Sequence, residues 1–451
     1  MTSSRYDVAI VGGGVAGLAA ASALAETGKR VVVLEARGEL GGRATAFVDR
    51  ETGELVDNGQ HVLFGCYHET FAFLRRVGAE ANVFVQPALE VPYLDANARR
   101  SVLKCPPLPS PLHLLGAILR WDALPWADRL RALRLAAPLL RARRNSMDAA
   151  PPHETVSQWL TRYGQQGRLR EWLWEPLAVA ALNQSPSEAA AAPFVRVLAL
   201  MFGAERTDAS LVLPATPLHQ MYAWPARRYI ESRGGLVRTH ALARIRVAGN
   251  RVAGIDVRGE PVDAMAVIAA VPWFALPQLV TGDTTLLDRT LAAASRMPAK
   301  PIVTVNLWYD RPVMDDGFVG LPGRAMQWVF DKRQAFGERA SHLSLVSSGA
   351  DALVGMESDA LVALAAREVA GAIPGARDAQ LRRGTVIREK RATFSLAPGA
   401  PPRPPVETPV NGLFLAGDWI DTGLPGTIES AALAGHRAAR TLSRAFSSPE
   451  P

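Results

Sequence analysis

Cysteine is almost missing from this chain of 451 residues, which contains only Cys66 and Cys105. Two separate cysteines without a CxxC pattern argue against a disulfide scaffold and against a structural zinc site. The eight histidines are scattered along the chain, and no H-x-x-x-H pair occurs. We therefore expect a protein that works without a metal ion.

Long apolar runs are also missing. None approaches the roughly 20 residues that a helix needs to cross a bilayer. The N-terminal stretch MTSSRYDVAIVGGG is unlike a secretory signal, because glycines interrupt its apolar part. These features predict a cytoplasmic protein and leave open a peripheral contact with the inner face of the cytoplasmic membrane.

Signatures of nucleic-acid binding are absent too, although the formal net charge is +7. Most of the positive charge comes from arginines spread along the chain, so we expect no nucleic-acid partner. Hydrophobic residues make up 48% and charged residues 21%, which is typical of a folded globular protein. At this length we expect two or three domains.

The stretch YDVAIVGGGVAGLAAASALAETGKRVVVLEAR near the N-terminus predicts a dinucleotide site. Residues 8–11 have the pattern of a buried parallel strand, and an Ala-rich helix at 18–24 precedes a second strand at 31–34. The glycines between the first strand and the helix fit G-x-G-x-x-G; they are Gly12, Gly14 and Gly17. Such glycines permit a tight turn, close approach of a pyrophosphate and close packing of helix on strand.

Glu35 and the residues after it favour FAD over NAD. Glu35 can accept hydrogen bonds from both ribose hydroxyls, and Ala36 and Arg37 follow it at the expected adenosine end. Gly42, in a glycine pair, lets the chain lie flat against a cofactor, and Arg43 can neutralise its diphosphate. Together these motifs resemble the FAD-binding signature of the amine oxidase and phytoene desaturase superfamily, so we expect FAD as the cofactor.

The C-terminal stretch GLFLAGDWIDTGLPGTIESAALAGHRAARTL completes the expected FAD site. A strand at 413–416 leads into Gly417 and Asp418, whose carboxylate can hold ribityl hydroxyls. A helix expected from about Thr427, with Ile428 in its first turn, would direct its N-terminus at the flavin pyrimidine edge. Residues 234–257 resemble the strand-rich part of the FAD domain in the same superfamily, which implies that Leu242 lies against the adenine.

We therefore predict an α/β fold in which a Rossmann-type FAD-binding domain carries a second, mixed α+β substrate domain. The FAD-binding domain is expected to be discontinuous, formed by residues 1–75, 233–272 and 405–445. Residues 76–232 and 273–404 would form the substrate-binding domain. That part is rich in Trp, Leu, Phe and Met and has no second dinucleotide fingerprint, so the external electron donor stays unidentified.

Residues 106–145 combine an apolar helical face with many arginines. Leu130, Leu133, Ala137 and Leu140 share that face, and Trp121 and Trp126 precede it. The surrounding arginines are Arg129, Arg131, Arg134, Arg141, Arg143 and Arg144. This pattern suits an anionic membrane surface, but it also fits a surface helix that packs on its own domain.

Residues 55–70, LVDNGQHVLFGCYHET, resemble a segment that passes beside the flavin in phytoene desaturases. With PLAVAALNQSPSEAAAAPF (176–194) and FLAGDWIDTGLPGTIESA (414–431), they make the chain similar to the squalene-associated FAD-dependent desaturase family. Its members are hydroxysqualene dehydroxylases of bacterial hopanoid biosynthesis. The resemblance covers residues 6 to 440 and implies that reduced FAD converts hydroxysqualene, an isoprenoid, to squalene and water.

The resemblance also implies roles at the flavin. Gly59 would lie flat against the isoalloxazine, and His61 would face the substrate. His61 is the first candidate for the acid that protonates the leaving hydroxyl, because its ordinary pKa near 6.5 suits proton donation. Asp57 is the second candidate, with Glu175 and Asp421 in reserve. A histidine that only fixes the loop is the alternative.

Three other activities stay open. The same scaffold could support a phytoene-type desaturase, in which hydride moves from the hydrocarbon to the flavin. A flavin amine oxidase ranks lower, because no cysteine follows Cys105 to form a flavin bond. A lipid-binding protein with a vestigial flavin site would carry no FAD.

Overall fold

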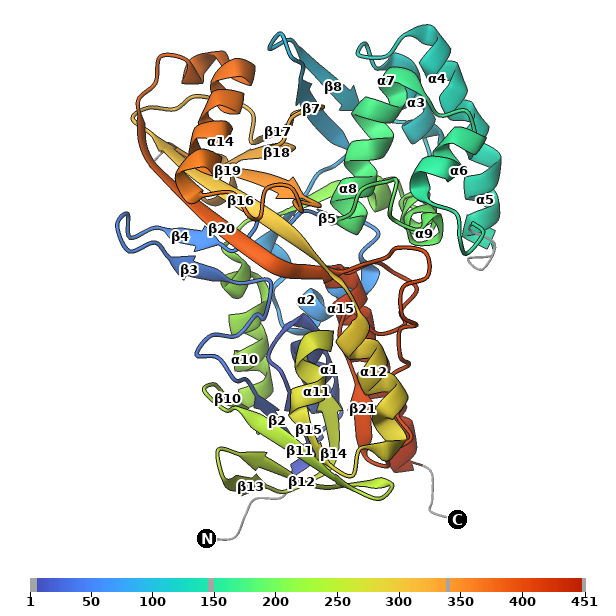
Figure 1. Cartoon of the computed structure of the whole chain (residues 1–451), viewed down its shortest axis with the longest axis vertical. Coiled ribbons are helices and arrows are strands. Elements are labelled where there is room, and N and C mark those ends of the chain that lie inside the picture. Colours follow the sequence, from blue (N-terminus) through green and yellow to red (C-terminus); the bar gives the residue numbers. More distant parts are fainter. Residues whose placement is uncertain (1–5, 145–149, 338–340, 448–451) are drawn as a thin grey trace.

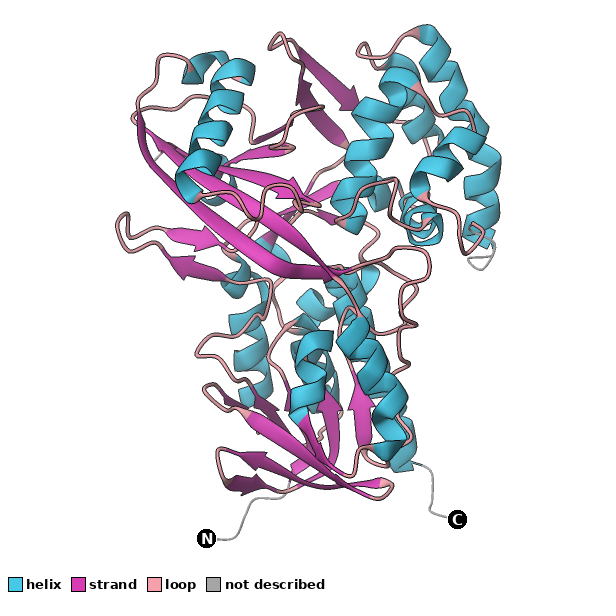
Figure 2. Ribbon diagram, viewed as in Figure 1, coloured by secondary structure: helices cyan, strands magenta, loops and turns pink. Residues whose placement is uncertain are grey.

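The computed structural model describes residues 6–144, 150–337 and 341–447 (Figure 1). Residues 1–5 of the first predicted FAD-binding segment and residue 145 of the predicted membrane-facing segment lie outside the described residues. The chain forms two regions along its long axis: a parallel sheet with helices near the termini, and a larger, mostly antiparallel sheet beside a cluster of helices (Figure 2).

A five-stranded parallel sheet draws its strands from three distant parts of the sequence, in the order β10-β2-β1-β14-β21. The strands are β1 (Tyr6–Val11), β2 (Val31–Leu34), β10 (Leu236–Arg238), β14 (Ala264–Ala269) and β21 (Leu413–Leu415). The predicted strands at 8–11, 31–34 and 413–416 are present, with ends shifted by at most two residues. Pairing between strands this far apart in sequence brings the two ends of the chain together.

Both faces of this sheet are covered, which explains why its strands are apolar throughout. Val8 and Ile10 of β1 share a core with the helices α1 (Val15–Glu26), α10 (Trp224–Glu231) and α15 (Ile428–Ser447). Ala9 and Val11 point to the opposite face, into a core shared with a small four-stranded sheet. That sheet consists of β11 (Ala243–Ala248), β12 (Arg251–Val257), β13 (Glu260–Val262) and β15 (Val280–Gly282).

The second region is built on a seven-stranded sheet in the order β20-β16-β19-β18-β17-β7-β8. Its strands are β7 (Glu90–Leu94), β8 (Arg100–Lys104), β16 (Ala299–Tyr309), β17 (Phe318–Gly320), β18 (Trp328–Asp331), β19 (Ser341–Ser348) and β20 (Leu381–Phe394). The long strands β16 and β20 descend toward the parallel sheet (Figure 1). Helix α14 (Ser358–Ala372) packs against both of them.

A cluster of helices stands beside the seven-stranded sheet, at the upper right of Figure 1. It contains α3 (Leu112–Arg120), α4 (Trp126–Ala132), α5 (Ala136–Arg144), α6 (Val156–Arg162), α7 (Gly167–Leu169), α8 (Glu175–Leu182) and α9 (Ala191–Met201). Two pieces complete the fold: the hairpin β3 (Ala46–Val48)–β4 (Leu55–Asp57), and a three-stranded sheet of β5 (Leu63–Phe64), β6 (Val83–Val85) and β9 (Leu211–Pro214).

The predicted fold class is confirmed: a Rossmann-type parallel sheet with flanking helices carries a second region of mixed α and β structure. The residue bounds proposed for the two domains stay a prediction. Within the described ranges, no helix combines the length and the apolar character needed to cross a bilayer.

Candidate functional site

A cavity of about 650 Å³ lies between the parallel sheet and the seven-stranded sheet. The turn after β1, the start of α15, residues beside β11 and the ends of β16 and β20 all contribute to its wall. Most of the residues predicted to bind FAD line it: Gly12, Gly14, Glu35, Ala36, Arg37, Gly42, Arg43, Gly59, Leu242, Gly417, Asp418, Thr427 and Ile428. Gly17 does not line the cavity; it lies behind the wall, where it lets α1 pack closely on Gly12.

The turn after β1 and the first turn of α1 leave no room for a side chain at Gly12 and Gly17. Gly12 has φ +113°, a region that favours glycine, and a Cβ on Gly17 would stand 1.9 Å from the Gly12 carbonyl oxygen. Gly14 precedes α1 and gives it no side-chain cap. The first N–H groups of that helix therefore lie at the cavity wall without a capping side chain, which suits an anionic phosphate.

The glycine pair predicted to approach a cofactor lies directly against this turn. Gly42 has φ +62°, and a Cβ there would meet the Gly14 Cα at 3.2 Å. Gly14 and Gly41 also form an isolated parallel bridge. The two glycine segments thus make one smooth wall, here called the glycine wall (Gly12, Gly14 and Gly42).

Glu35 is buried at the end of β2, and two backbone groups orient its carboxylate. Its Oε2 accepts a hydrogen bond from the Gly13 N–H at 2.7 Å, and its Oε1 accepts from the Arg37 N–H at 2.8 Å. Each carboxylate oxygen can accept more than one hydrogen bond. Glu35 is therefore positioned to accept from the hydroxyls of a ribose in the cavity.

Arg43 and Asp418, predicted to bind different parts of FAD, contact each other in the structure. The Arg43 guanidinium donates to the Asp418 carboxylate and, at 2.7 Å, to the Ala392 carbonyl at the end of β20. It also stacks over the Trp273 ring, 5.4 Å from the centroid. Both residues line the cavity, so their predicted contacts with the diphosphate and the ribityl chain stay predictions.

The start of α15 faces the cavity, as expected for a helix that stabilises negative charge. Thr427 and Ile428 line the wall, and Thr427 Oγ1 accepts a hydrogen bond from the Ser430 N–H at 3.1 Å. Thr427 therefore caps the helix and leaves the positive end of its dipole directed at the cavity.

His61 is half-buried at the cavity, in the segment 57–61, here called the DNGQH loop. Its Nδ1 lies 2.8 Å from the Gly59 carbonyl oxygen. A carbonyl only accepts, so Nδ1 carries the proton, and Nε2 of the neutral ring is an acceptor. Burial lowers the pKa of His61, and the neighbouring charges of Lys332 and Arg43 lower it as well, against the opposing effects of the Gly59 carbonyl and Asp57.

Asp57 lies outside the cavity, in a buried ion pair with Lys332. Lys332 Nζ donates to Asp57 Oδ2 at 2.9 Å and to Gln60 Oε1 at 2.9 Å, while Asp57 Oδ1 accepts from the Leu218 N–H at 3.1 Å. The prediction of Asp57 as an acid at the substrate does not match this position, because both of its oxygens are engaged away from the cavity.

Lys332 is the functional residue that the sequence did not reveal. Its side chain is 1% exposed, and it follows β18, 275 positions away from Asp57. A single lysine after a strand carries no recognisable signal, so only the fold brings it under the DNGQH loop. The reserve acids are remote: Glu175 pairs with Arg170 at 2.8 Å and Asp421 lies 3.5 Å from Arg403, and neither lines the cavity.

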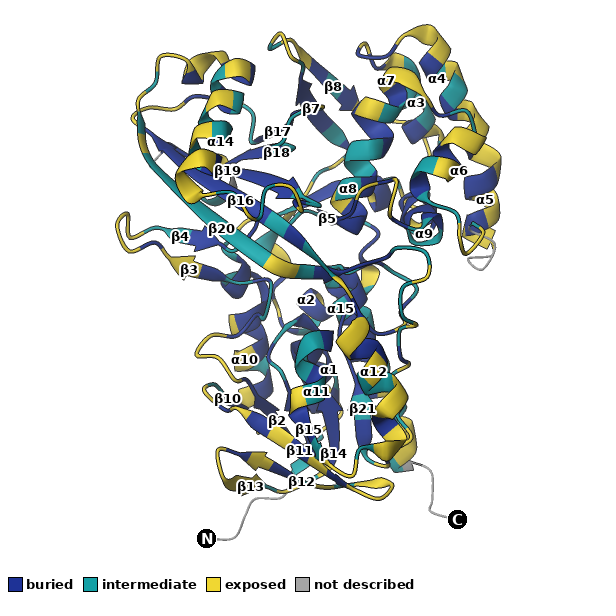
Figure 3. Cartoon of the chain, viewed as in Figure 1, coloured by how far each residue is buried: buried dark blue, intermediate teal, exposed yellow. Residues whose placement is uncertain are grey.

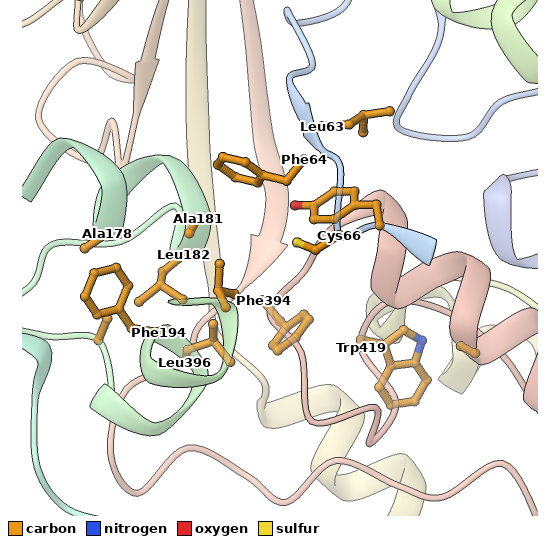
Figure 4. Packing of buried hydrophobic residues seen from close by; sticks show 14 of the residues in the cluster. Leu63, Phe64, Cys66, Ala178, Ala181, Leu182, Phe194, Phe394, Leu396 and Trp419 are labelled. Carbon is orange, nitrogen blue, oxygen red and sulfur yellow. The ribbon is translucent and has the colours of Figure 1, made fainter. Parts of the chain in front are cut away.

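One part of the cavity wall is apolar. It includes Ala180 and Ala181 of α8, Ile302 of β16, Val346 of β19 and Val62 beside His61. Figure 4 shows Phe64, Ala181 and Phe394, which come from three different elements, in one buried hydrophobic cluster. Such a wall offers dispersion contacts and excludes water from a bound hydrocarbon.

Comparison with known proteins identifies the family of this chain. The model of the family "Flavin containing amine oxidoreductase" matches residues 15–443. The chain therefore belongs to the flavin-containing amine oxidoreductases, which are flavin-dependent oxidoreductases.

The narrower resemblance is also confirmed. The chain is 32% identical to the hydroxysqualene dehydroxylase of Rhodopseudomonas palustris, over 96% of this chain and 97% of that protein. It is 24% identical to the 15-cis-phytoene desaturase of Synechococcus elongatus, over 96% of this chain and 95% of that protein. Among solved structures, an oxidoreductase from Methanosarcina mazei is similar with a TM-score of 0.76 and 17% sequence identity. The match covers 96% of this chain and 100% of that chain, and it supports the fold.

Proposed function

We propose that this protein reduces hydroxysqualene to squalene, using FAD as its flavin and releasing the hydroxyl as water. The observation that supports this most is the single cavity in which a glycine wall and Glu35 meet the DNGQH loop and an apolar wall. The 32% identity to a hydroxysqualene dehydroxylase over nearly the whole chain supports the choice of substrate.

FAD fits the residues that line this cavity. The uncapped start of α1 and the glycine wall suit a diphosphate, and the fixed carboxylate of Glu35 suits the ribose hydroxyls. Leu242, 57% exposed at the far end, would lie against the adenine. A mononucleotide flavin has neither a ribose nor an adenine and would leave Glu35 and Leu242 without their expected partners.

Reduced FAD, when bound, supplies the hydride that replaces the hydroxyl of the substrate. The chain's part is to hold the substrate in a dry pocket and to assist departure of the hydroxyl, which leaves poorly without a proton. His61 is the group placed for this: its Nε2 can contact the substrate oxygen, and it can donate a proton there while the ring is protonated. Gly59 and Lys332 hold its ring and its loop, so the orientation of His61 is established before the substrate binds.

The direct test is an anaerobic single turnover. The purified protein is reduced chemically and mixed with hydroxysqualene, and flavin absorbance is followed while squalene is measured by mass spectrometry. We expect reoxidation of one flavin per squalene formed. A flavin that stays reduced in the presence of hydroxysqualene would exclude this function.

A phytoene-type desaturase is the second candidate, because desaturases of this kind share the full length of the chain at 24% identity. It would run in the opposite direction and take hydride from a hydrocarbon. Oxidised protein supplied with phytoene would then form a polyene that absorbs visible light. The same protein sample in both assays decides between the two directions.

The partners follow from the substrate class. We propose an isoprenoid hydrocarbon as substrate, an external donor that returns two electrons per turnover, and a cytoplasmic location with access to the inner face of the membrane. Squalene dissolves poorly in water, so substrate and product would be exchanged with a bilayer.

A further inference from the structure

An exposed apolar stripe runs along the helical cluster, on α4, the 3₁₀ turn η2 (Leu133–Leu135) and α5. Trp126, Leu130, Leu133, Ala137 and Leu140 recur at alternating spacings of four and three residues, so they share one face. Trp126 is 66% exposed, Leu130 57%, Leu133 39% and Leu140 42%. We call these five residues the α4–α5 stripe.

This stripe is not the face by which the helices pack on the protein. The buried apolar residues of the same segment lie on the opposite side, and they are Ala132, Leu135, Pro138, Leu139 and Ala142. Helix α5 packs against α9, and α4 packs against α3 and α7. In Figure 3 these helices show buried colour toward the cluster and exposed colour on the outside. A helix that only packed on its own domain would have left its outer face polar.

Exposed apolar side chains are also concentrated here. Of the 16 large hydrophobic side chains that are exposed among the described residues, six lie within 106–145, less than a tenth of the chain. Two of them, Leu108 and Leu112, precede the stripe. Trp121 is the exception to the predicted surface pattern: it is 1% exposed and packs beside Tyr93 and Trp172, so it belongs to the core.

Positive charge borders the stripe. Residues 126–144 contain six arginines and one acidic residue, Asp128, which is buried and pairs with Arg131 at 2.5 Å. Arg129 stacks on Trp126, 4.6 Å from the ring centroid, while Arg141, Arg143 and Arg144 are exposed. Positive charge beside exposed Trp and Leu complements a surface that is anionic outside and apolar inside.

We propose that the α4–α5 stripe docks the protein on an anionic lipid bilayer, with Trp126 and the leucines at the acyl boundary and the arginines at the lipid phosphates. The inference rests on the proposed function only for the identity of the cargo, a hydrocarbon exchanged with the membrane. The docking surface itself is independent of turnover. The attraction of the arginines to lipid phosphates is electrostatic and is screened by salt, so binding depends on both lipid charge and salt concentration.

The test uses the full-length protein and sedimentation with vesicles, without substrate. Vesicles of phosphatidylcholine containing phosphatidylglycerol should bind the protein at low salt, and vesicles of phosphatidylcholine alone should bind it at least tenfold more weakly. Raising the salt concentration should release it. Equal binding to both vesicles, or no binding to either, would overturn the proposal.

Two matched pairs of variants locate the surface. Leu140→Glu should weaken vesicle binding at least tenfold, whereas Leu286→Glu, at a leucine of similar exposure (46%) outside the stripe, should leave it unchanged. The double variant Arg141→Gln/Arg143→Gln should weaken binding about 25-fold, at about fivefold per arginine, and Arg251→Gln/Arg289→Gln should not. Equal losses within either pair would mean that the stripe is not the contact.

A second copy of the chain is the competing occupant. If sedimentation equilibrium shows a dimer that Leu140→Glu dissociates, and vesicles do not bind the wild type, the stripe is a protein interface and the proposal fails. Failure of the proposed function can be distinguished from failure of this inference. If the protein binds anionic vesicles through the stripe but forms no squalene, the docking surface stands and the proposed function fails.

Discussion

The two walls of the cavity are built in different ways. On one side, the glycine wall consists of main chain, and its residues lie within 30 positions of one another, from Gly12 to Gly42. On the other side, the DNGQH loop is held by the side chain of Lys332, which follows strand β18 of the seven-stranded sheet and lies 275 positions away from Asp57. A wall made of main chain depends on local spacing, whereas a wall made of distant side chains depends on the complete fold.

This difference predicts how each wall fails when it is altered. Behind the side-chain wall, the DNGQH loop rests on the buried Asp57–Lys332 charge pair, so removing one of these charges should cost stability. Beside the main-chain wall, the Glu35 carboxylate is expected to contact the cofactor. Removal of this carboxylate should lower cofactor affinity while the fold remains.

The largest effect should follow Lys332→Met. The substitution leaves the Asp57 carboxylate buried without its cation, and it should lower the free energy of unfolding by about 3–5 kcal/mol. Urea unfolding followed by circular dichroism measures this loss. The double variant Lys332→Met/Asp57→Asn, which removes both charges, should recover a large part of it.

Lys300 offers the matched control. It also pairs with two carboxylates, Glu188 at 2.8 Å and Asp351 at 3.2 Å, but both of those partners are more than half exposed. Lys300→Met should therefore cost no more than about 1 kcal/mol. Equal losses for the two lysines would show that the Lys332–Asp57 pair is no better shielded from water than the Lys300 pairs.

An intermediate effect is expected for Glu35→Ala. The fold should survive, but FAD should bind more weakly by about 1–3 kcal/mol, because a charged acceptor for the ribose hydroxyls is lost. Equilibrium titration of apoprotein with FAD would show a dissociation constant raised roughly fivefold to 150-fold. Glu39→Ala, at an exposed glutamate four residues later, is the control and should leave the constant unchanged. An unaltered constant in Glu35→Ala would refute the ribose contact.

The sequence predicted that Gly12, Gly14 and Glu35 would come together, for a physical reason. A tight turn, a helix start and an acid at a strand end each follow from neighbouring residues, so local spacing alone was enough to place Gly12, Gly14 and Glu35 at one site. The same logic located Gly417 and the start of α15 from a second local pattern. Residue types alone could not separate an apolar wall from an ordinary core, because Ile302 and Val346 look the same in either place.

The arrangement of the DNGQH loop was only partly predictable. The DNGQH loop was recognised as a site, and His61 does line the cavity, but its neighbour Asp57 was expected there as well. Alternation along the short strand β4 and the loop after it turns Asp57 away, toward Lys332. No pattern in the sequence predicts the Asp57–Lys332 pair, since it forms where two sheets meet.

The smallest effect concerns the protonation of His61, and it tests whether this residue is an acid or only fixes the loop. Burial lowers its pKa below the ordinary 6.5, with Lys332 and Arg43 adding to the shift and Asp57 opposing it. If the protonated ring donates to the leaving hydroxyl, turnover should be highest below this pKa. Turnover should fall as the pH rises through this pKa, by at most about tenfold per pH unit.

The variant His61→Phe should keep its FAD, turn over more slowly and lose this pH dependence. His68→Asn, at an exposed histidine outside the cavity, should retain it. Single-turnover rates from pH 5.5 to 8 decide the matter. A wild-type rate that instead rises with pH would mean that the neutral ring, with Nε2 as an acceptor, orients the substrate hydroxyl and that the proton comes from elsewhere.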